Sequence, residues 1–285
     1  MKLSKAFIYT FLGSLFWAIS IVLLKYILEQ GDNAYNILIW TSIISIPYWA
    51  FRFFSKKTEI KKLTKQDYSI LIGMGIISSI GVYIAEFLAL KYSPAINYSF
   101  LIRTVILFTF LFAYLFLGEK ITKKKIILAA LLLIGAYLLT TNGKIISLTK
   151  GDLFTILEAA LIALGNNVFG KMATNRMSSQ ISASGSILIG FIPKMVLVMF
   201  LTTIVIPKMF LLTFILSIVY ILLTEFRFIA YKHASATYVT MIFSFTPVLV
   251  SFMAIPFLHE SMTLIQIIGG LFIIATGVMV EKLKI

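Results

Sequence analysis

The sequence predicts an all-α integral membrane protein of ten transmembrane helices, arranged as two inverted five-helix repeats. Three observations support this fold class: the composition, the number of long apolar runs, and an internal duplication. Of the 285 residues, 60% are hydrophobic and 13% are charged, and the mean hydropathy is +1.01. Soluble globular domains do not reach such values, so the chain is expected to cross a membrane several times.

Ten apolar runs are long enough to cross a bilayer, which requires about 20 residues in a helix. They occupy residues 6–28, 34–54, 68–90, 94–117, 125–141, 152–173, 185–206, 209–231, 235–258 and 263–281. The first run follows Lys2 and Lys5, as in a signal peptide, but it has no small-x-small cleavage site and nine further runs follow. We therefore expect it to be a retained helix.

The chain contains the same pattern twice. Residues 94–122 and 235–263 match at an offset of 141, and both end in Phe-Leu-x-Glu-x-x-Thr, with the glutamates at Glu119 and Glu260. At an offset of 146, residues 17–25 fall on residues 163–171. A repeat of this length predicts two similar halves, which we place at residues 1–146 and 147–285.

The distribution of Lys and Arg predicts the orientation. With the N-terminus inside the cell, 17 of the 25 basic residues fall on the inner side and four in outer loops. The positive-inside rule then places both termini in the cytoplasm and the protein in the cell (inner or plasma) membrane. Because each half has an odd number of spans, the second half enters from the opposite side, which is the usual construction of transporters that work by alternating access.

Several short motifs carry a resemblance to a known family. The first run contains Trp17-Ala18 and is closed by Lys25. The motif Leu-Gly-Glu-x-x-Thr at residues 117–122 recurs as Leu-His-Glu-x-x-Thr. With the two-half, ten-helix layout, these motifs resemble the EamA family of the drug/metabolite transporter superfamily. His259 departs from the glycine of the turn, and Ala163-Leu164 replaces Trp-Gly in the sixth run.

The resemblance implies a fold and an activity. It implies a central cavity lined by the first, third, fourth, sixth, eighth and ninth helices, with one EamA-type repeat in each half. It also implies export or exchange of small metabolites, amino acids among them, without a nucleotide-hydrolysing partner. It does not name the substrate, because one scaffold serves many solutes.

The fourth and ninth runs supply the first candidate substrate-binding residues. Polar residues recur along one face of the ninth run, including Thr240 and Ser244, at the spacing of an α-helix. The repeat maps these two positions onto Ser99 and Arg103 of the fourth run. All four are therefore expected to face the cavity, because polar groups inside a membrane usually do so or contact another helix.

Arg103 is the candidate ligand for a substrate anion. It lies nine residues from Pro94, or about 13 Å at 1.5 Å per residue, near the middle of the membrane. The alternative is a buried arginine that Glu86 or Glu158 and backbone carbonyls satisfy, with a role in folding only.

The third and eighth runs supply the remaining candidates. Tyr83 and Glu86 map onto Thr224 and Arg227, and Tyr220 lies one turn before this second pair. We expect one helical face to carry each set, combined with Arg103 in one cavity. The alternative is that Glu86 and Arg227 reach the membrane interfaces.

The sixth and seventh runs hold further polar residues. Glu158, Asn166 and Asn167 on the sixth run are interpreted as cavity-lining or as interhelical hydrogen-bonding residues. Lys194, near the middle of the seventh run, pairs with a carboxylate or with substrate, or lies at the periphery.

These features favour a secondary transporter, an exporter or exchanger of small polar or amphipathic metabolites, zwitterions among them. No nucleotide, metal or cysteine motif occurs, so no cofactor and no enzymatic activity are expected. The alternative is an integral-membrane lipid-modifying enzyme or a flippase for lipid-linked metabolites. The expected partners are a small-molecule substrate and the lipid bilayer, not nucleic acid, and the chain is expected to be a monomer or a homodimer through its paired glycines.

Overall fold

The computed structural model describes residues 4–258 and 261–283, and every regular element in this part of the chain is a helix. Ten helical segments within it are long and apolar enough to cross a membrane. This confirms the predicted fold class. The elements are α1 (Lys5–Glu29), α2 (Ala34–Phe54), α3 (Lys57–Ile60), α4 (Lys65–Ile76), η1 (Ile77–Gly81), α5 (Val82–Tyr92), α6 (Ala95–Leu101), η2 (Ile102–Thr104), α7 (Val105–Leu117), α8 (Lys123–Thr141), α9 (Lys150–Ile162), η3 (Ala163–Val168), α10 (Phe169–Arg176), α11 (Ser179–Leu201), α12 (Phe210–His233), α13 (Ala236–Phe243), α14 (Thr246–Leu258) and α15 (Leu264–Leu283).

Four spans are interrupted within the membrane. The third consists of α4 and α5 joined by the π-helical turn η1, and the sixth consists of α9 and α10 joined by the π-helical turn η3. The fourth is broken by the 3₁₀ turn η2 between α6 and α7. The ninth is broken by a turn between α13 and α14. Such irregularities inside helices are frequent at functional sites.

The seventh span begins and ends earlier than its hydropathy predicts. The apolar run suggested residues 185–206, but α11 occupies Ser179–Leu201. The Ser178 hydroxyl accepts a hydrogen bond from the backbone N–H of Ile181 at 3.2 Å, and Glu59 accepts one from the backbone N–H of Ser178 at 2.6 Å. This N-cap fixes the helix start in a stretch of small polar residues that a hydropathy window counts as loop.

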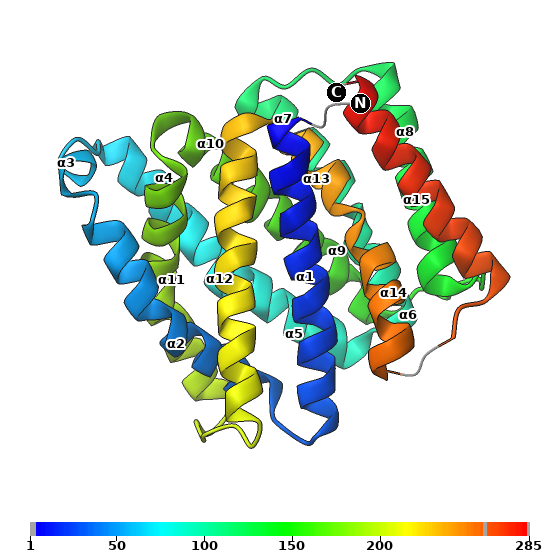
Figure 1. The fold of residues 1–285 in the computed structure, drawn as a ribbon, viewed down its shortest axis with the longest axis horizontal. Coiled ribbons are helices and arrows are strands. Elements are labelled where there is room, and N and C mark those ends of the chain that lie inside the picture. The colour runs from blue at the N-terminus through cyan, green and yellow to red at the C-terminus, as the bar shows by residue number, and fades with distance from the viewer. Residues whose placement is uncertain (1–3, 259–260, 284–285) are drawn as a thin grey trace.

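Both ends of the described chain lie on the same side of the bundle (Figure 1). We call the side at which α1 begins and α15 ends the terminal face, and the other side the opposite face. Because each repeat contributes five spans, the first spans of the two repeats cross the bundle in opposite directions. The repeats are therefore inverted, as predicted.

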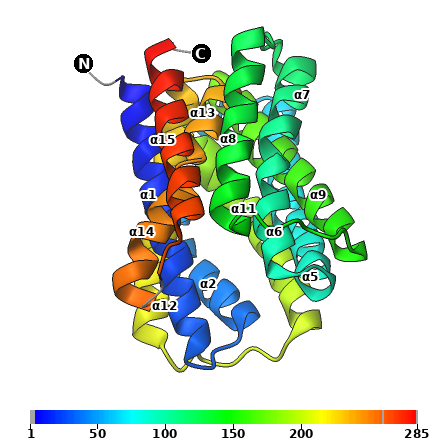
Figure 2. The same cartoon turned by 90° about the vertical axis from the view of Figure 1, so that its right-hand side faces the viewer.

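The fourth and ninth spans pack on each other near the terminal face but on different neighbours toward the opposite face. Near the terminal face α7 packs against α13, whereas toward the opposite face α6 packs on α8 and α9, and α14 packs mainly on α1. Figure 2 shows the ribbons gathered near the chain ends and spread on the other side. The fourth and ninth spans therefore meet mainly near the terminal face.

Candidate functional site

The breaks in the fourth and ninth spans fall at equivalent positions of the two repeats. The turn η2 spans Ile102–Thr104, and the offset of 141 places it on residues 243–245, where the ninth span is interrupted. Arg103 stands at the first break and Ser244 at the second. Both predicted site residues therefore lie where the helix backbone departs from α geometry, halfway across the bundle.

A cavity of about 90 Å³ lies beside these two breaks. Four of the predicted residues line it: Arg103, Arg227, Thr240 and Ser244. The other lining residues come from the first, fourth, sixth, eighth and ninth spans and are Trp17, Val105, Ile162, Asn166, Asn167, Tyr231 and Phe243. The third span, which the resemblance implies as a wall, contributes no lining residue to this cavity in the described structure.

Two guanidinium groups line this cavity. Arg227 lies 5.7 Å from the ring centroid of Trp17 and 5.3 Å from that of Phe243, so aromatic faces stabilise its charge. Arg103 has a buried Nε without a hydrogen-bond partner in the described structure. Within that part of the chain, neither arginine forms an ion pair, so the alternative of an Arg103 salt bridge to Glu86 or Glu158 does not describe this structure.

The side chain of Asn167 closes the cavity toward the terminal face. Its Nδ2 donates to Thr109 Oγ1 at 2.8 Å and to Thr240 Oγ1 at 3.1 Å, and Tyr231 donates its hydroxyl to Asn167 Oδ1 at 2.8 Å. These bonds join the fourth, sixth, eighth and ninth spans. Asn167 therefore both lines the cavity and makes interhelical hydrogen bonds, the two roles that the sequence left open.

Glu86 and Tyr83 belong to a separate group nearer the opposite face. The sequence combined them with Arg103 in one cavity, but neither lines the cavity in which Arg103 lies. The π-helical turn η1 directly precedes both residues, and a π turn adds a residue and so rotates the following helix by up to about 100° relative to a continuous α-helix. Lys194 contacts this group: its Nζ lies 5.1 Å from the Tyr83 ring centroid and 3.3 Å from Ser42 Oγ.

The remaining predicted residues are dispersed. Tyr220 interacts electrostatically with Tyr83 and Glu86, and so belongs to the group near the opposite face. Ser99 and Thr224 are half-buried and do not line the cavity. Three aromatic residues line the cavity although the sequence did not propose them as ligands. Trp17 could have been found, because it belongs to the family motif. Tyr231 and Phe243 could not, because aromatic residues are common in apolar runs.

The repeated Leu-Gly-Glu-x-x-Thr motif has a structural role at the terminal face. Gly118 ends α7 with a left-handed φ of 67°, and the Thr122 hydroxyl caps α8 by accepting from the backbone N–H of Lys125. Glu119 accepts hydrogen bonds from the backbone N–H of Ala236 at 2.7 Å and from the Thr237 hydroxyl at 2.6 Å. The first repeat therefore holds the start of α13 in the second. His259 and Glu260, in the second copy, lie outside the described residues.

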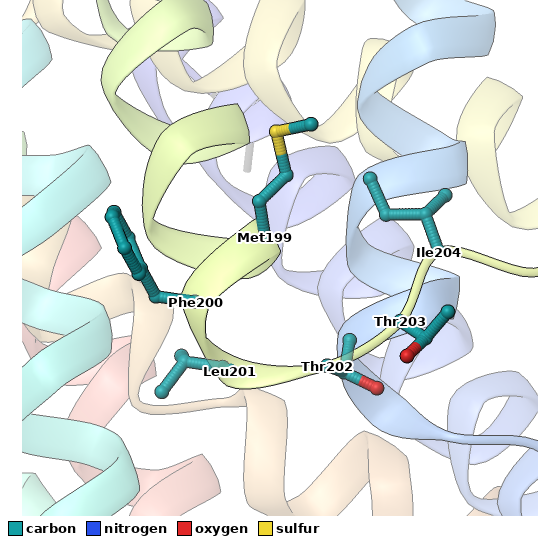
Figure 3. A pocket seen from close by; sticks show the side chains of 6 residues that line it. All are labelled: Met199, Phe200, Leu201, Thr202, Thr203 and Ile204. Carbon is teal, nitrogen blue, oxygen red and sulfur yellow. The ribbon is translucent and has the colours of Figure 1, made fainter.

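A larger recess of about 540 Å³ lies at the end of α11, yet it carries no chemistry (Figure 3). It is open, and one continuous segment lines it, residues 199–204, without a charged side chain. We regard the smaller cavity as the functional candidate, because five spans and two guanidinium groups form it. No group of three or more potential metal ligands occurs in the described part of the chain.

Comparison with known proteins supports the fold and identifies the family. None of the curated proteins matches this chain. One solved structure, described only as the crystal structure of a protein, has a TM-score of 0.79 at 16% identity and covers 99% of this chain and 98% of its own. The family model for EamA-like transporters matches twice, over residues 4–141 and 149–280. The chain therefore belongs to the EamA-like transporter family.

Proposed function

We propose that this protein is a secondary transporter, an exporter or exchanger of small polar or amphipathic metabolites such as amino acids, which works by alternating access. The single observation that carries this proposal is the pair of guanidinium groups, Arg103 and Arg227, which line one mid-membrane cavity without an ion-pair partner in the described structure. A charge within a membrane is costly unless it is paired, so an anionic substrate group supplies the missing partner.

The asymmetric packing of the bundle supports the alternating-access part of the proposal. Asn167 and Glu119 close the terminal face through hydrogen bonds between spans, whereas α6 and α14 have different packing partners toward the opposite face. Inverted repeats allow this asymmetry to be reversed, because each half can adopt the conformation of the other. The structure then corresponds to a state closed at the terminal face.

We propose that the terminal face is cytoplasmic. The support is the excess of Lys and Arg on that side, 17 against four, under the positive-inside rule. Single cysteines in place of Lys61 and Asn33 test this orientation in a chain that has no cysteine of its own. An impermeant thiol reagent added to cells should label position 33 only; labelling of position 61 from outside contradicts the orientation.

We expect the substrate to be a small molecule and leave monomer and homodimer as alternatives for the assembly. The paired glycines suggested close contact between helices, and some of them make that contact within the chain. A Cβ on Gly269 would lie 2.6 Å from the backbone nitrogen of Leu139, and one on Gly75 would lie 2.8 Å from the carbonyl oxygen of Ser186. These glycines therefore serve close packing of the tenth span on the fifth and of the third on the seventh.

The substrate site is tested by uptake into proteoliposomes preloaded with a mixture of amino acids and small organic acids. Arg103→Gln and Arg227→Gln should raise KM for a transported anion or zwitterion by at least tenfold, as expected for loss of about 1.5–3 kcal/mol from a charged hydrogen bond. Lys61→Gln, an exposed cation in the loop between the second and third spans, is the matched control. Unchanged KM with lower thermal stability would show that the arginines serve folding alone.

A further inference from the structure

A group of exposed lysines lies in the short connection between the second and third spans. The second span ends with α2 at Phe54 and the third begins with α4 at Lys65, so residues 55–64 alone join them. The lysines here are Lys56, Lys57, Lys61, Lys62 and Lys65, and all five are exposed. A connection this short cannot carry its side chains far from the two span ends. The five charges are therefore held near the membrane surface.

These lysines form a compact group because the connection folds into the helical turn α3. The backbone N–H of Ile60 donates to the carbonyl oxygen of Lys56 at 3.0 Å, and that of Lys61 donates to the carbonyl oxygen of Lys57 at 3.2 Å. Side chains four residues apart in a helix are neighbours, so Lys57 and Lys61 project side by side. We call residues 56–65 the basic turn. It lies around α3, at one end of the long axis of the bundle and toward the terminal face (Figure 1).

The acidic residues in and beside the basic turn bind other parts of the chain. Both carboxylate oxygens of Glu59 accept from Ser178, one from its backbone N–H at 2.6 Å and one from its hydroxyl at 2.8 Å. Asp67 is buried and accepts from Arg176 at 2.5 Å and from the Thr64 hydroxyl at 2.7 Å. Within the described residues, none of the five lysines forms an ion pair. Their charges are therefore available to a partner outside the chain.

Other cations on the same side have partners within the chain. The Lys171 ammonium donates to the carbonyl oxygen of Tyr231 at 2.6 Å. Arg52, just before the basic turn, forms an ion pair with Glu225 at 2.8 Å. The positive-inside rule accounts for the side on which basic residues occur. It does not account for five of them gathered in one turn without an acidic partner.

Exposed aromatic rings next to the basic turn indicate what kind of partner it binds. Phe51 and Phe54, on the last turn of α2, are 72% and 59% exposed, and Tyr68, near the start of α4, is 40% exposed. Aromatic rings at the ends of spans lie where acyl chains meet headgroups. A soluble acidic protein would match the lysines but not these rings. An anionic phospholipid matches both, because its phosphate and its acyl chains are joined in one molecule.

We propose that the basic turn is a binding site for anionic phospholipids of the adjoining leaflet. The lysine ammonium groups bind the headgroup phosphates, and Phe51 and Phe54 contact the acyl chains below them. The basic turn lies at the edge of the bundle, and none of its residues lines the cavity of Arg103 and Arg227, which we call the arginine cavity. The lipid site is therefore separate from the proposed substrate site and does not depend on the proposed function.

A fluorophore on the basic turn tests this site without any substrate. The chain has no cysteine, so Thr58→Cys, at an exposed position, carries the only label. The protein is placed in phosphatidylcholine liposomes that contain either spin-labelled phosphatidylglycerol or spin-labelled phosphatidylcholine at equal mole fraction. Quenching should show that the anionic lipid associates about fivefold or more tightly, the contribution expected of one lysine near charged lipid. Equal quenching by both lipids overturns the proposal.

Two triple variants distinguish a local site from general attraction to the basic side of the protein. Replacing Lys57, Lys61 and Lys62 together by Gln should lower the lipid preference to about a fifth of the unsubstituted value or less. The matched control replaces three other exposed lysines by Gln, namely Lys120, Lys123 and Lys124. The last two begin α8, near the other end of the bundle (Figure 1), so the preference at position 58 should be retained. Equal loss in both triple variants overturns the local site.

Additions to the buffer test the chemistry of the site in the labelled chain without lysine substitutions, so that folding of a variant is not in question. Sodium chloride raised from about 0.1 M to about 1 M should weaken the preference, because salt screens exposed charges. Sodium phosphate at the same ionic strength should weaken it no further; a specific effect of phosphate would indicate a site for free anions and overturn the lipid proposal. If the anionic lipid is not preferred but soluble polyglutamate changes the fluorescence at position 58, the basic turn binds an acidic protein instead, and the lipid proposal is wrong.

Discussion

The two interfaces at which long helices of the repeats meet are built differently. The first and eighth spans, α1 and α12, cross the bundle without interruption and pack along each other. Their repeat counterparts, the sixth and third spans, also pack on each other, but each contains a π turn, η3 and η1. We call these the straight seam and the bent seam.

The residues in the two seams explain the difference. In the straight seam, the Phe226 ring lies 6.2 Å from Tyr9 and 5.6 Å from Phe16, which are stacked pairs. In the bent seam, Ser78 within η1 donates a hydrogen bond to Asn166 Oδ1 within η3 at 2.6 Å. Aromatic rings fill a continuous interface, whereas small polar residues tolerate an irregular backbone.

The comparison suggests where the molecule changes shape. Asn166 also lines the arginine cavity, so the bent seam connects a helix interruption to the candidate substrate site. Under the alternating access proposed above, inverted repeats exchange conformations, so the seam that is bent in this structure is expected to straighten in the other state. The straight seam should then contribute mainly stability in this state, and the bent seam should affect transport as well.

The largest expected effect comes from adding a methyl group to the bent seam. In Gly165→Ala the new Cβ would lie 2.7 Å from Ile77 Cγ2 and 3.1 Å from the Ser78 hydroxyl, so the two π turns must separate. Such overpacking costs about 1–3 kcal/mol, which thermal unfolding in detergent measures. Gly270→Ala is the matched control, because its Cβ meets nothing within 4 Å; it should raise stability, by up to about 1 kcal/mol. Equal stability of the two variants would contradict the tight packing of the bent seam.

Removing a ring from the straight seam should lower stability and leave substrate affinity unchanged. Phe226→Leu loses two stacked pairs, each worth about 0.5–1.5 kcal/mol beyond the buried area. The expected result is a lower unfolding temperature with wild-type KM in the proteoliposome assay. A changed KM with unchanged stability would show that the two seams do not divide these roles.

Breaking the hydrogen bond between the two π turns should have a smaller effect on stability. Ser78→Ala removes one donor, which is worth about 0.5–1.5 kcal/mol. A double-mutant cycle with Asn166→Ala isolates this interaction, because the double variant should lose less than the sum of the single variants. Strict additivity of the two single losses would show that the hydrogen bond does not couple the turns.

Much of the fold could be predicted because the hydropathy of each segment is enough, without distant contacts, to identify it as a span. The exception at the seventh span arose where Ser178 caps a helix that begins with small polar residues. The π turns could not be predicted, because the sequence of η1 is Ile-Ser-Ser-Ile-Gly and has no breaker other than its last residue. A π turn at such a place depends on contacts with a distant helix, such as the one between Ser78 and Asn166.

The candidate site was predictable only in part, for the same reason. The polar face of the ninth span correctly predicted that Thr240 and Ser244 line the cavity. The prediction held because Thr240 precedes the break between α13 and α14 and Ser244 lies in it. Thr237, about one turn before Thr240 on the same helix, instead donates a hydrogen bond to Glu119. The sequence grouped Tyr83 and Glu86 with Arg103 in one cavity, but periodicity did not reveal the π turn η1 that directly precedes these two residues. Periodicity therefore predicted neighbours only as far as the nearest interruption.

The smallest expected effect comes from weakening the contact that closes the terminal face in this structure. Glu119 accepts from the backbone N–H of Ala236 and from Thr237 at the start of α13, so its negative charge also interacts favourably with the helix dipole. Glu119→Gln keeps the shape but removes the charge, at a cost of about 0.3–1 kcal/mol. Under the proposed alternating access, that cost falls only on the state in which the terminal face is closed, and so should shift the population toward the other state by about two- to fivefold.

A single cysteine at Ser244, which lines the cavity, reports this shift in the otherwise cysteine-free chain. Its labelling rate from the terminal face should rise about two- to fivefold in Glu119→Gln, by the same energy. Glu59→Gln is the matched control, because Glu59 also accepts from a helix start, at Ser178, but lies away from the contact between α7 and α13. If both glutamine variants accelerate labelling equally, general loosening explains the result. If only Glu119→Gln does so, the contact between the repeats at Glu119 stabilises the closed terminal face.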